Sequence, residues 1–267
     1  MNQTNSKIDY QTAAGLAIIT LNDPPANTYS YEMMQQLDRA ILDARMDDAV
    51  QVIVIIGKGE KFFCAGADIQ MLANVTPAFK YYFCLHANET LSRLEQTPKL
   101  VIAAINGHCV GGGLEVAMAA DIRIARKGAG KMGLPEVSLG VLPGTGGTQR
   151  LVRIVGKSKA IELMATGQLF DFERGLELGL VNQVFEAETG DRFGEMVRDY
   201  ASQFTTPNKA AHAVGSIKRA VQTGSEIPFE SALALERELQ QQLFQSEDAK
   251  EGLQAYVEKR KAQFKGR

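Results

Sequence analysis

The chain of 267 residues has only three cysteines, almost no net charge and no long apolar run. The cysteines lack CxxC spacing, which argues against a disulfide framework or a zinc knuckle and predicts a reducing, cytoplasmic location. The 29 Lys+Arg and 31 Asp+Glu give a formal net charge of −2, so no strong electrostatic field attracts the chain to nucleic acid or anionic lipid. Apolar runs such as residues 52–56 are far shorter than the roughly 20 residues that span a bilayer. We therefore expect neither a nucleic-acid-binding nor a membrane protein.

The chain is 45% hydrophobic, which is ample material for a packed core and excludes general disorder. In the first part, β-branched runs alternate with patterns of helical period, and this predicts an α/β fold. The expected strands cover residues 16–21, 52–56, 101–105 and 122–125, and the expected helices include 77–96 and one that runs from the glycines at 144–147 to 155.

After about residue 191 the strand patterns stop and three helical patterns follow. They cover residues 192–204, 208–223 and 229–264, the last with an interruption near Ser246. The sequence thus predicts an α/β core domain at residues 1–190 and a helical domain at residues 191–267.

Several common catalytic signatures fail when they are compared letter by letter. Residues 144–149 carry Gln149 where a dinucleotide fingerprint needs glycine, and Leu151 stands where a P-loop needs its first glycine. Ser138 lacks the first glycine of a nucleophile elbow. The three histidines are too scattered for a metal pair, and His108 at a strand end is better explained as a packed or hydrogen-bonded structural residue. Nucleotide, serine-hydrolase and metal chemistry are all disfavoured.

Two glycine-rich or small-residue turns remain as candidate sites. Residues 111–113 follow a buried strand and open a helix, so bare backbone N–H groups there can approach an anionic ligand. Glu115 lies in the first turn of that helix among apolar residues, where it either complements the helix dipole or performs acid/base chemistry. Residues 62–69 form a second turn, which either faces a ligand or is an ordinary turn whose helix Asp68 caps. Each feature alone leaves both interpretations open.

Glu136 follows Pro135 in a loop, where it is either a surface turn residue or part of a site. Together with its surroundings it belongs to a longer pattern. The segments that carry this pattern are residues 63–69, 106–115, 133–136 and 139–151, followed by 247–252 and 256–261 in the tail. In order and spacing they resemble the enoyl-CoA hydratase/isomerase (crotonase) family over nearly the whole chain.

The resemblance implies a spiral of ββα units with a C-terminal helical domain that builds homotrimers, commonly stacked as hexamers. It further implies an oxyanion hole for a thioester enolate, formed by the backbone N–H groups of Ala65 and Gly112. Such donors stabilise charge that develops in the transition state. No metal or other cofactor is implied, because coenzyme A is part of the substrate.

Within the family, two carboxylates are typical of hydratases, and Glu115 and Glu136 match both. The resemblance implies that Glu115 activates water, that Glu136 protonates Cα, and that the product of syn addition to a 2-enoyl-CoA is a 3-hydroxyacyl-CoA. The residues implied in binding the acyl-CoA are Ala65, Gly66, Ala67, Asp68, Ile69 and Gly112, with Lys259 near the CoA phosphate.

Three alternatives are weighed against this hydratase interpretation. A Δ3,Δ2-enoyl-CoA isomerase of the same family would rely on Glu136 alone, and a dehalogenase would need an Asp nucleophile that residues 141–149 lack. One family branch binds RNA through a lysine-rich helix, but residues 31–39 contain no lysine. One departure is an extra residue within 126–131, which leaves the spacing of the two carboxylates to be established by the structure.

Overall fold

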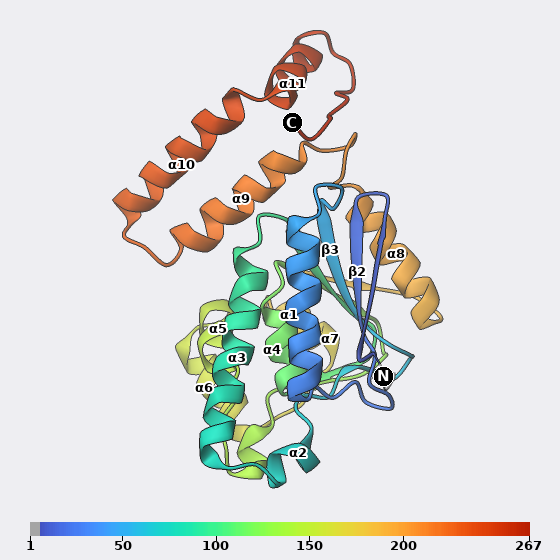
Figure 1. Ribbon diagram of the computed structural model, residues 1–267, viewed down its shortest axis with the longest axis vertical. Coiled ribbons are helices and arrows are strands. Elements are labelled where there is room, and N and C mark those ends of the chain that lie inside the picture. The colour runs from blue at the N-terminus through green and yellow to red at the C-terminus, as the bar shows by residue number, and fades with distance from the viewer. Residues whose placement is uncertain (1–5) are drawn as a thin grey trace, which may run out of the picture.

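The computed structural model describes residues 6–267, and a six-stranded sheet forms its centre (Figure 1). The strand order is β1-β2-β3-β5-β7-β9, in which β1 pairs antiparallel with β2 and all other pairs are parallel. The strands are β1 (Ile8–Ala13), β2 (Leu16–Leu21), β3 (Val52–Gly57), β5 (Leu100–Ile105), β7 (Ile122–Arg126) and β9 (Gln183–Phe185).

Three short strands form a second parallel sheet in the order β4-β6-β8. They are β4 (Phe62–Cys64), β6 (His108–Val110) and β8 (Met132–Gly133). Each one directly follows a long strand of the first sheet and precedes a helical segment, so the unit β-β-α recurs along the chain. This repetition confirms the predicted spiral of ββα units and the α/β fold class.

Both faces of the central sheet are buried, which explains why its strands are continuous apolar runs rather than alternating ones. The buried apolar residues form two clusters. Ile53 and Ile55 of β3 belong to the larger cluster, whereas Val52 and Val54 belong to the smaller one. Burial of each such side chain contributes about 1.5–3 kcal/mol. The larger core also contains apolar residues of α1 (Tyr31–Met46) and α3 (Pro77–Gln96).

Six further helical segments belong to the core. They are α2 (Ile69–Ala73), α4 (Gly112–Met118), the 3₁₀ helix η1 (Glu136–Leu139), α5 (Gly147–Val155), α6 (Lys157–Thr166) and α7 (Phe172–Glu177). Among them, α4 contacts β4 and β6 of the second sheet. The first turn of α4 and the start of η1 lie at the carboxyl ends of β6 and β8. Because β6 and β8 are paired neighbours, the starts of these two helices lie close together.

The opposite face of the sheet is covered by α8 (Gly190–Ser202), whose Phe193 and Val197 are fully buried. The sequence analysis grouped this helix with the C-terminal domain, but its packing places it on the core. The three following helices, α9 (Ala211–Gly224), α10 (Phe229–Phe244) and α11 (Glu247–Val257), form an arm that extends from the core (Figure 1).

The expected strands and the helix at 77–96 are confirmed, and Ser246 caps α11 at the predicted interruption. Several details differ. The edge strand β1, half of whose residues are polar and half exposed, was not anticipated, and neither were the short strands β4, β6, β8 and β9. Helix α9 begins at Ala211 instead of 208, and the last helix ends at Val257, beyond which Lys259 has a positive φ of 55° that ends helical geometry. No helix within residues 6–267 combines the length and apolarity needed to cross a bilayer.

Candidate active site

Glu115 lies in a site that its neighbouring glycines make possible. Helix α4 starts where Gly111, at φ +56°, donates its N–H to the carbonyl of Gly133. A Cβ atom on Gly113 would lie 2.1 Å from the backbone oxygen of Cys64, so only glycine allows α4 to approach the turn after β4 this closely. This packing buries Glu115, which is 2% exposed.

The Glu115 carboxylate accepts three hydrogen bonds from one turn. The backbone N–H groups of Thr145 and Gly147 donate to Oε1 at 2.8 and 2.6 Å. The hydroxyl of Thr145 donates to Oε2. Buried carboxylates are stable only when such partners compensate for lost water. The turn at the start of α5 thus supplies the hydrogen-bond donors that the apolar surroundings of Glu115 lack.

Glu136 lies against Gly111, and its environment differs from that of Glu115. It starts η1, it is half-buried, and a Cβ on Gly111 would lie 3.1 Å from its Oε1. Its Oε2 is buried and has no hydrogen-bond partner among residues 6–267. The pKa of Glu136 is raised to about 7, mainly by burial and also by the neighbouring Glu115 carboxylate, whereas a hydrogen bond from its own backbone and the charge of Lys80 oppose the rise. Glu136 is therefore largely protonated just below neutral pH.

The structure brings Glu115 and Glu136 together, as the sequence analysis expected. The extra residue within 126–131 does not separate them, because β8 is held in register with β6 through the pairs Cys109–Met132 and Val110–Gly133. The turn between β7 and β8 accommodates the difference in length.

The predicted oxyanion donor Ala65 needs correction. Its N–H donates to the carbonyl of Ala26 at 3.0 Å and is therefore engaged within the protein. Two residues further along, the N–H of Ala67 has no acceptor among residues 6–267, and neither has the N–H of Gly112 at the start of α4. A Cβ on Gly66 would lie 3.0 Å from the nitrogen of Gly112, so the turn and the helix start are in contact. The available donor pair is Ala67 and Gly112.

Asp68 caps helix α2, since its carboxylate accepts from the N–H groups of Gln70 and Met71 at 2.9 and 3.1 Å. This confirms the capping interpretation of that residue. The implied contacts of Ala65, Gly66, Ala67, Asp68 and Ile69 with coenzyme A stay predictions.

His108 has a structural role. Its Nδ1 accepts from the N–H of Lys131 at 3.1 Å, and its ring lies against Phe62 with the centroids 5.3 Å apart. The sequence-based interpretation of His108 as a packed, hydrogen-bonded residue is confirmed.

Lys259 is exposed and follows α11 at the far end of the arm, whereas α2 lies at the other end of the molecule (Figure 1). One chain thus does not bring Lys259 to the two glutamates. Within the same basic cluster, Arg260 is engaged by Glu251 and Glu258 at 2.6 Å. The predicted contact between Lys259 and a CoA phosphate stays a prediction.

Sequence reasoning missed Tyr29 and the specific role of Thr145. Tyr29 is 3% exposed, and its hydroxyl lies 3.1 Å from the hydroxyl of Thr145, which in turn bonds Glu115. Thr145 stands inside the glycine-rich segment that the sequence analysis singled out, but Tyr29 lies in a stretch with no catalytic signature.

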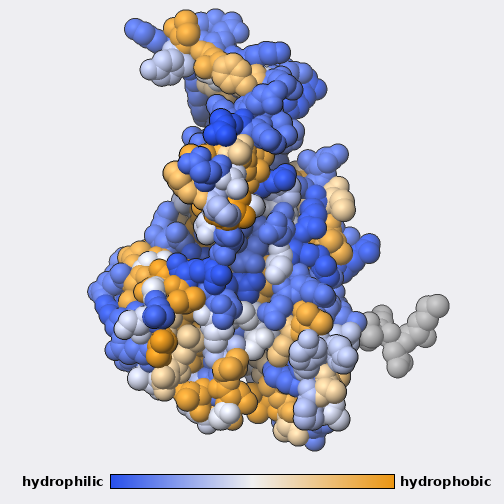
Figure 2. Space-filling view, turned by 90° about the vertical axis from the view of Figure 1, so that its left-hand side faces the viewer, coloured by the Kyte–Doolittle hydropathy of each residue, from blue (hydrophilic) through white to orange (hydrophobic). Residues whose placement is uncertain are grey.

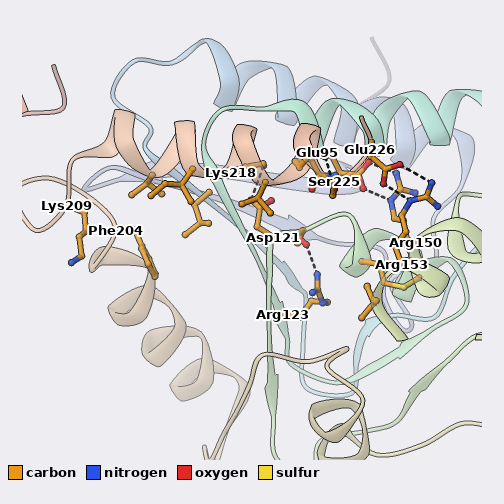
Figure 3. Close-up of a pocket in the computed structure, with 18 residues that line it drawn as sticks. Glu95, Asp121, Arg123, Arg150, Arg153, Phe204, Lys209, Lys218, Ser225 and Glu226 are labelled. Atoms are coloured by element: carbon orange, nitrogen blue, oxygen red, sulfur yellow. Dashed lines mark hydrogen bonds and ion pairs between the residues drawn. The ribbon is translucent and has the colours of Figure 1, made fainter. Parts of the chain in front are cut away.

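A cavity of about 1090 Å³ lies away from the glutamates, between α9 and the core (Figure 3). Its charges are mostly paired: Arg150 with Glu95 at 2.7 Å, Arg153 with Glu226 at 2.6 Å, and Lys218 with Asp121 at 2.9 Å. None of its lining residues belongs to the predicted site.

Comparison with known proteins shows the family of the chain. The model of the enoyl-CoA hydratase/isomerase family matches residues 11–267, and the chain belongs to this family. A probable enoyl-CoA hydratase of Bacillus subtilis (strain 168) is 39% identical, with 94% of this chain and 95% of the relative covered. A short-chain-enoyl-CoA hydratase of Clostridium acetobutylicum is 38% identical over the same shares.

Solved structures agree. The crystal structure of an enoyl-CoA hydratase from Geobacillus kaustophilus HTA426 superposes with a TM-score of 0.94 at 44% identity and covers 99% of this chain and 98% of that chain. The crotonase fold of this protein is thereby established.

Proposed function

We propose that this protein is an enoyl-CoA hydratase, a hydro-lyase that adds water reversibly across the 2,3 double bond of a 2-enoyl-CoA. The observation that carries the proposal is a pair of neighbouring carboxylates in unlike environments. Three donors bond the Glu115 carboxylate, while burial and an oxygen without a partner among residues 6–267 favour a proton on Glu136. A base and an acid in one site are what hydration requires.

The thioester oxygen of the substrate would accept from the N–H groups of Ala67 and Gly112. Neither N–H has an acceptor among residues 6–267, and a Cβ on Gly66, the residue before Ala67, would lie 3.0 Å from the nitrogen of Gly112. As water adds at C3, negative charge moves onto that oxygen. A preorganised donor is typically worth about 3 kcal/mol in such a transition state.

Glu115 then removes a proton from the attacking water, whose oxygen forms the new bond to C3. The electron pair of the double bond moves into the thioester as an enolate, and Glu136 delivers its proton to C2 as the enolate collapses. The thioester is restored, and the proton of the pair now resides on Glu115. The resting state returns when this proton is transferred back to Glu136.

The test measures the loss of enoyl-thioester absorbance when the purified protein is added to crotonyl-CoA, with Glu115→Gln and Glu136→Gln beside it. Removing one general acid or base typically costs 10²–10⁴-fold in kcat, so both variants should fall at least about 100-fold. Absence of hydration with crotonyl-CoA and with longer enoyl-CoAs would refute the proposal. A Glu115→Gln variant that still isomerises a 3-enoyl-CoA at the wild-type rate would indicate the isomerase instead.

The arm supports an oligomer as the working form. Ile217 and Val221 of α9, Phe229 of α10 and Tyr256 of α11 are all more than 60% exposed. Hydrophobic side chains are visible on this arm in Figure 2. Contiguous exposed apolar surface marks interfaces, so we propose that copies of this chain cover it in a homotrimer or a hexamer. Light scattering should then give three or six times the mass of one chain.

The three cysteines form no disulfide within the described residues. This fits the reducing cytoplasm as the proposed location of the activity.

A further inference from the structure

Tyr29 connects the two halves of the proposed site through its main chain. Its N–H donates to the carbonyl of Gly66 at 2.9 Å, and its carbonyl accepts from the N–H of Asp68 at 3.1 Å. These two bonds flank Ala67 on both sides. The backbone of Tyr29 thus fixes the segment that presents the N–H of Ala67.

The side chain of Tyr29 reaches the other half. A Cβ on Gly112 would lie 2.1 Å from the Tyr29 hydroxyl oxygen, so the phenol lies directly against the start of α4. Its ring packs against Phe83 with the centroids 5.8 Å apart. From this buried position the hydroxyl meets the hydroxyl of Thr145 at 3.1 Å.

The direction of the hydrogen bonds follows from the charge of Glu115. An ionised carboxylate only accepts, so the hydroxyl hydrogen of Thr145 points to Oε2 of Glu115. The hydrogen between the two hydroxyls must then come from Tyr29. Burial, together with the nearby Glu115, raises the pKa of the Tyr29 phenol well above its ordinary range, so the hydroxyl keeps the proton it donates.

A carboxylate has about four lone-pair positions, two on each oxygen. The N–H groups of Thr145 and Gly147 occupy those of Oε1, and the hydroxyl of Thr145 occupies one on Oε2. One position on Oε2 remains, and its direction is fixed by the other three bonds.

We propose that Tyr29 and Thr145 are positioning residues, which together hold Glu115 so that the remaining lone pair on Oε2 faces the attacking water. This rests on the proposed hydratase function. Tyr29 acts only through Thr145, whereas Thr145 bonds Glu115 directly.

The proposal predicts a graded loss in kcat for crotonyl-CoA hydration. Thr145→Val keeps the volume but removes the hydroxyl, and loss of a hydrogen bond to a charged group should lower kcat about 30-fold. Tyr29→Phe keeps the ring against Gly112 and should lower kcat about 5-fold, as expected for a neutral hydrogen bond. KM should stay within about twofold in both variants, because substrate binding is unaffected. Thr145→Ser, which restores the hydroxyl, should recover most of the lost rate.

We call the chain of hydrogen bonds from Tyr29 through Thr145 to Glu115 the relay. The double variant Tyr29→Phe/Thr145→Val tests whether Tyr29 acts through Thr145. It should be no slower than Thr145→Val alone, because without the Thr145 hydroxyl Tyr29 has no route to Glu115. A loss equal to the product of the two single losses would overturn the relay. An unchanged kcat in Thr145→Val would overturn it as well.

Two matched controls remove hydroxyls elsewhere. Tyr31 is partly exposed, and the buried hydroxyl of Thr90 has no hydrogen-bond partner in the part of the chain that the structure describes. Tyr31→Phe and Thr90→Val should therefore leave kcat within about twofold. Equal losses in these controls and in the site variants would mean that the effect is general and not a property of the relay.

A crystal structure of Thr145→Val separates failure of this inference from failure of the proposed function. If the wild-type protein hydrates no enoyl-CoA, the function is refuted, but the relay still predicts that Glu115 turns or takes two orientations in Thr145→Val and one in Thr145→Ser. A single, wild-type orientation of Glu115 in Thr145→Val would refute the relay regardless of activity.

Discussion

Glu115 and Glu136 are the same amino acid a short distance apart, yet the regions around them are opposites. The α4 region surrounds Glu115 with two backbone donors and a hydroxyl, and it is rigidly packed through glycines. The η1 region buries one oxygen of Glu136 without a partner among the described residues, whereas Val137 and Leu139 of η1 are exposed. In the proposed mechanism, the neighbours of each carboxyl, and not its residue type, decide which glutamate serves as base and which as acid.

The largest expected effect comes from shortening each side chain by one methylene. Glu115→Asp cannot reach the N–H groups of Thr145 and Gly147, which the turn holds in place, so kcat for hydration should fall about 100-fold or more. Glu136 lies on the more exposed η1, so Glu136→Asp should lower kcat about tenfold. Steady-state kinetics with crotonyl-CoA measures both values, and equal losses would show that the two regions are equally rigid.

Stability should separate the two regions as well. Glu115→Ala leaves the buried N–H groups of Thr145 and Gly147 without an acceptor, which should lower the free energy of unfolding by at least about 2 kcal/mol. Glu136→Ala removes a carboxyl that already lacks a partner on one oxygen, so the change at pH 7 should stay within about 0.5 kcal/mol. Urea denaturation with an unchanged m-value provides the measurement. A larger loss in Glu136→Ala would reverse the comparison.

The sequence predicts the local features of the site better than the contacts between distant segments. The apolar runs and glycine turns predict four strands of the sheet, α3 and α4, since each is a local pattern of burial or backbone approach. The same local patterns leave the roles of Glu115 and Glu136 open, and only the resemblance to the family selects the two glutamates. The contact of Tyr29 with Thr145 and the hydrogen bond of Ala65 to Ala26 join segments that only the tertiary fold brings together. The choice between Ala65 and Ala67 as donor therefore needs the structure, because both are alanines in one turn.

The smallest effect is expected at a third titratable residue near the same strands. His108 accepts a hydrogen bond from Lys131 and touches neither glutamate in the hydrogen bonds of the described residues. His108→Ala should leave kcat within about twofold and lower the melting temperature by a few degrees at most. A tenfold loss of kcat would bring a third proton-transfer group into the account and weaken the division of roles between the two glutamates.

The most direct test of that division is the pH dependence of kcat/KM for crotonyl-CoA hydration between pH 5 and 9. The reaction needs the pair to hold one proton, which Glu136 loses as the pH rises through its raised pKa of about 7. We predict that kcat/KM falls about tenfold per pH unit above that value. Dehydration of 3-hydroxybutyryl-CoA should give the same profile, because the overall reaction releases no proton. A hydration profile that stays flat from pH 6 to 9 would contradict the account.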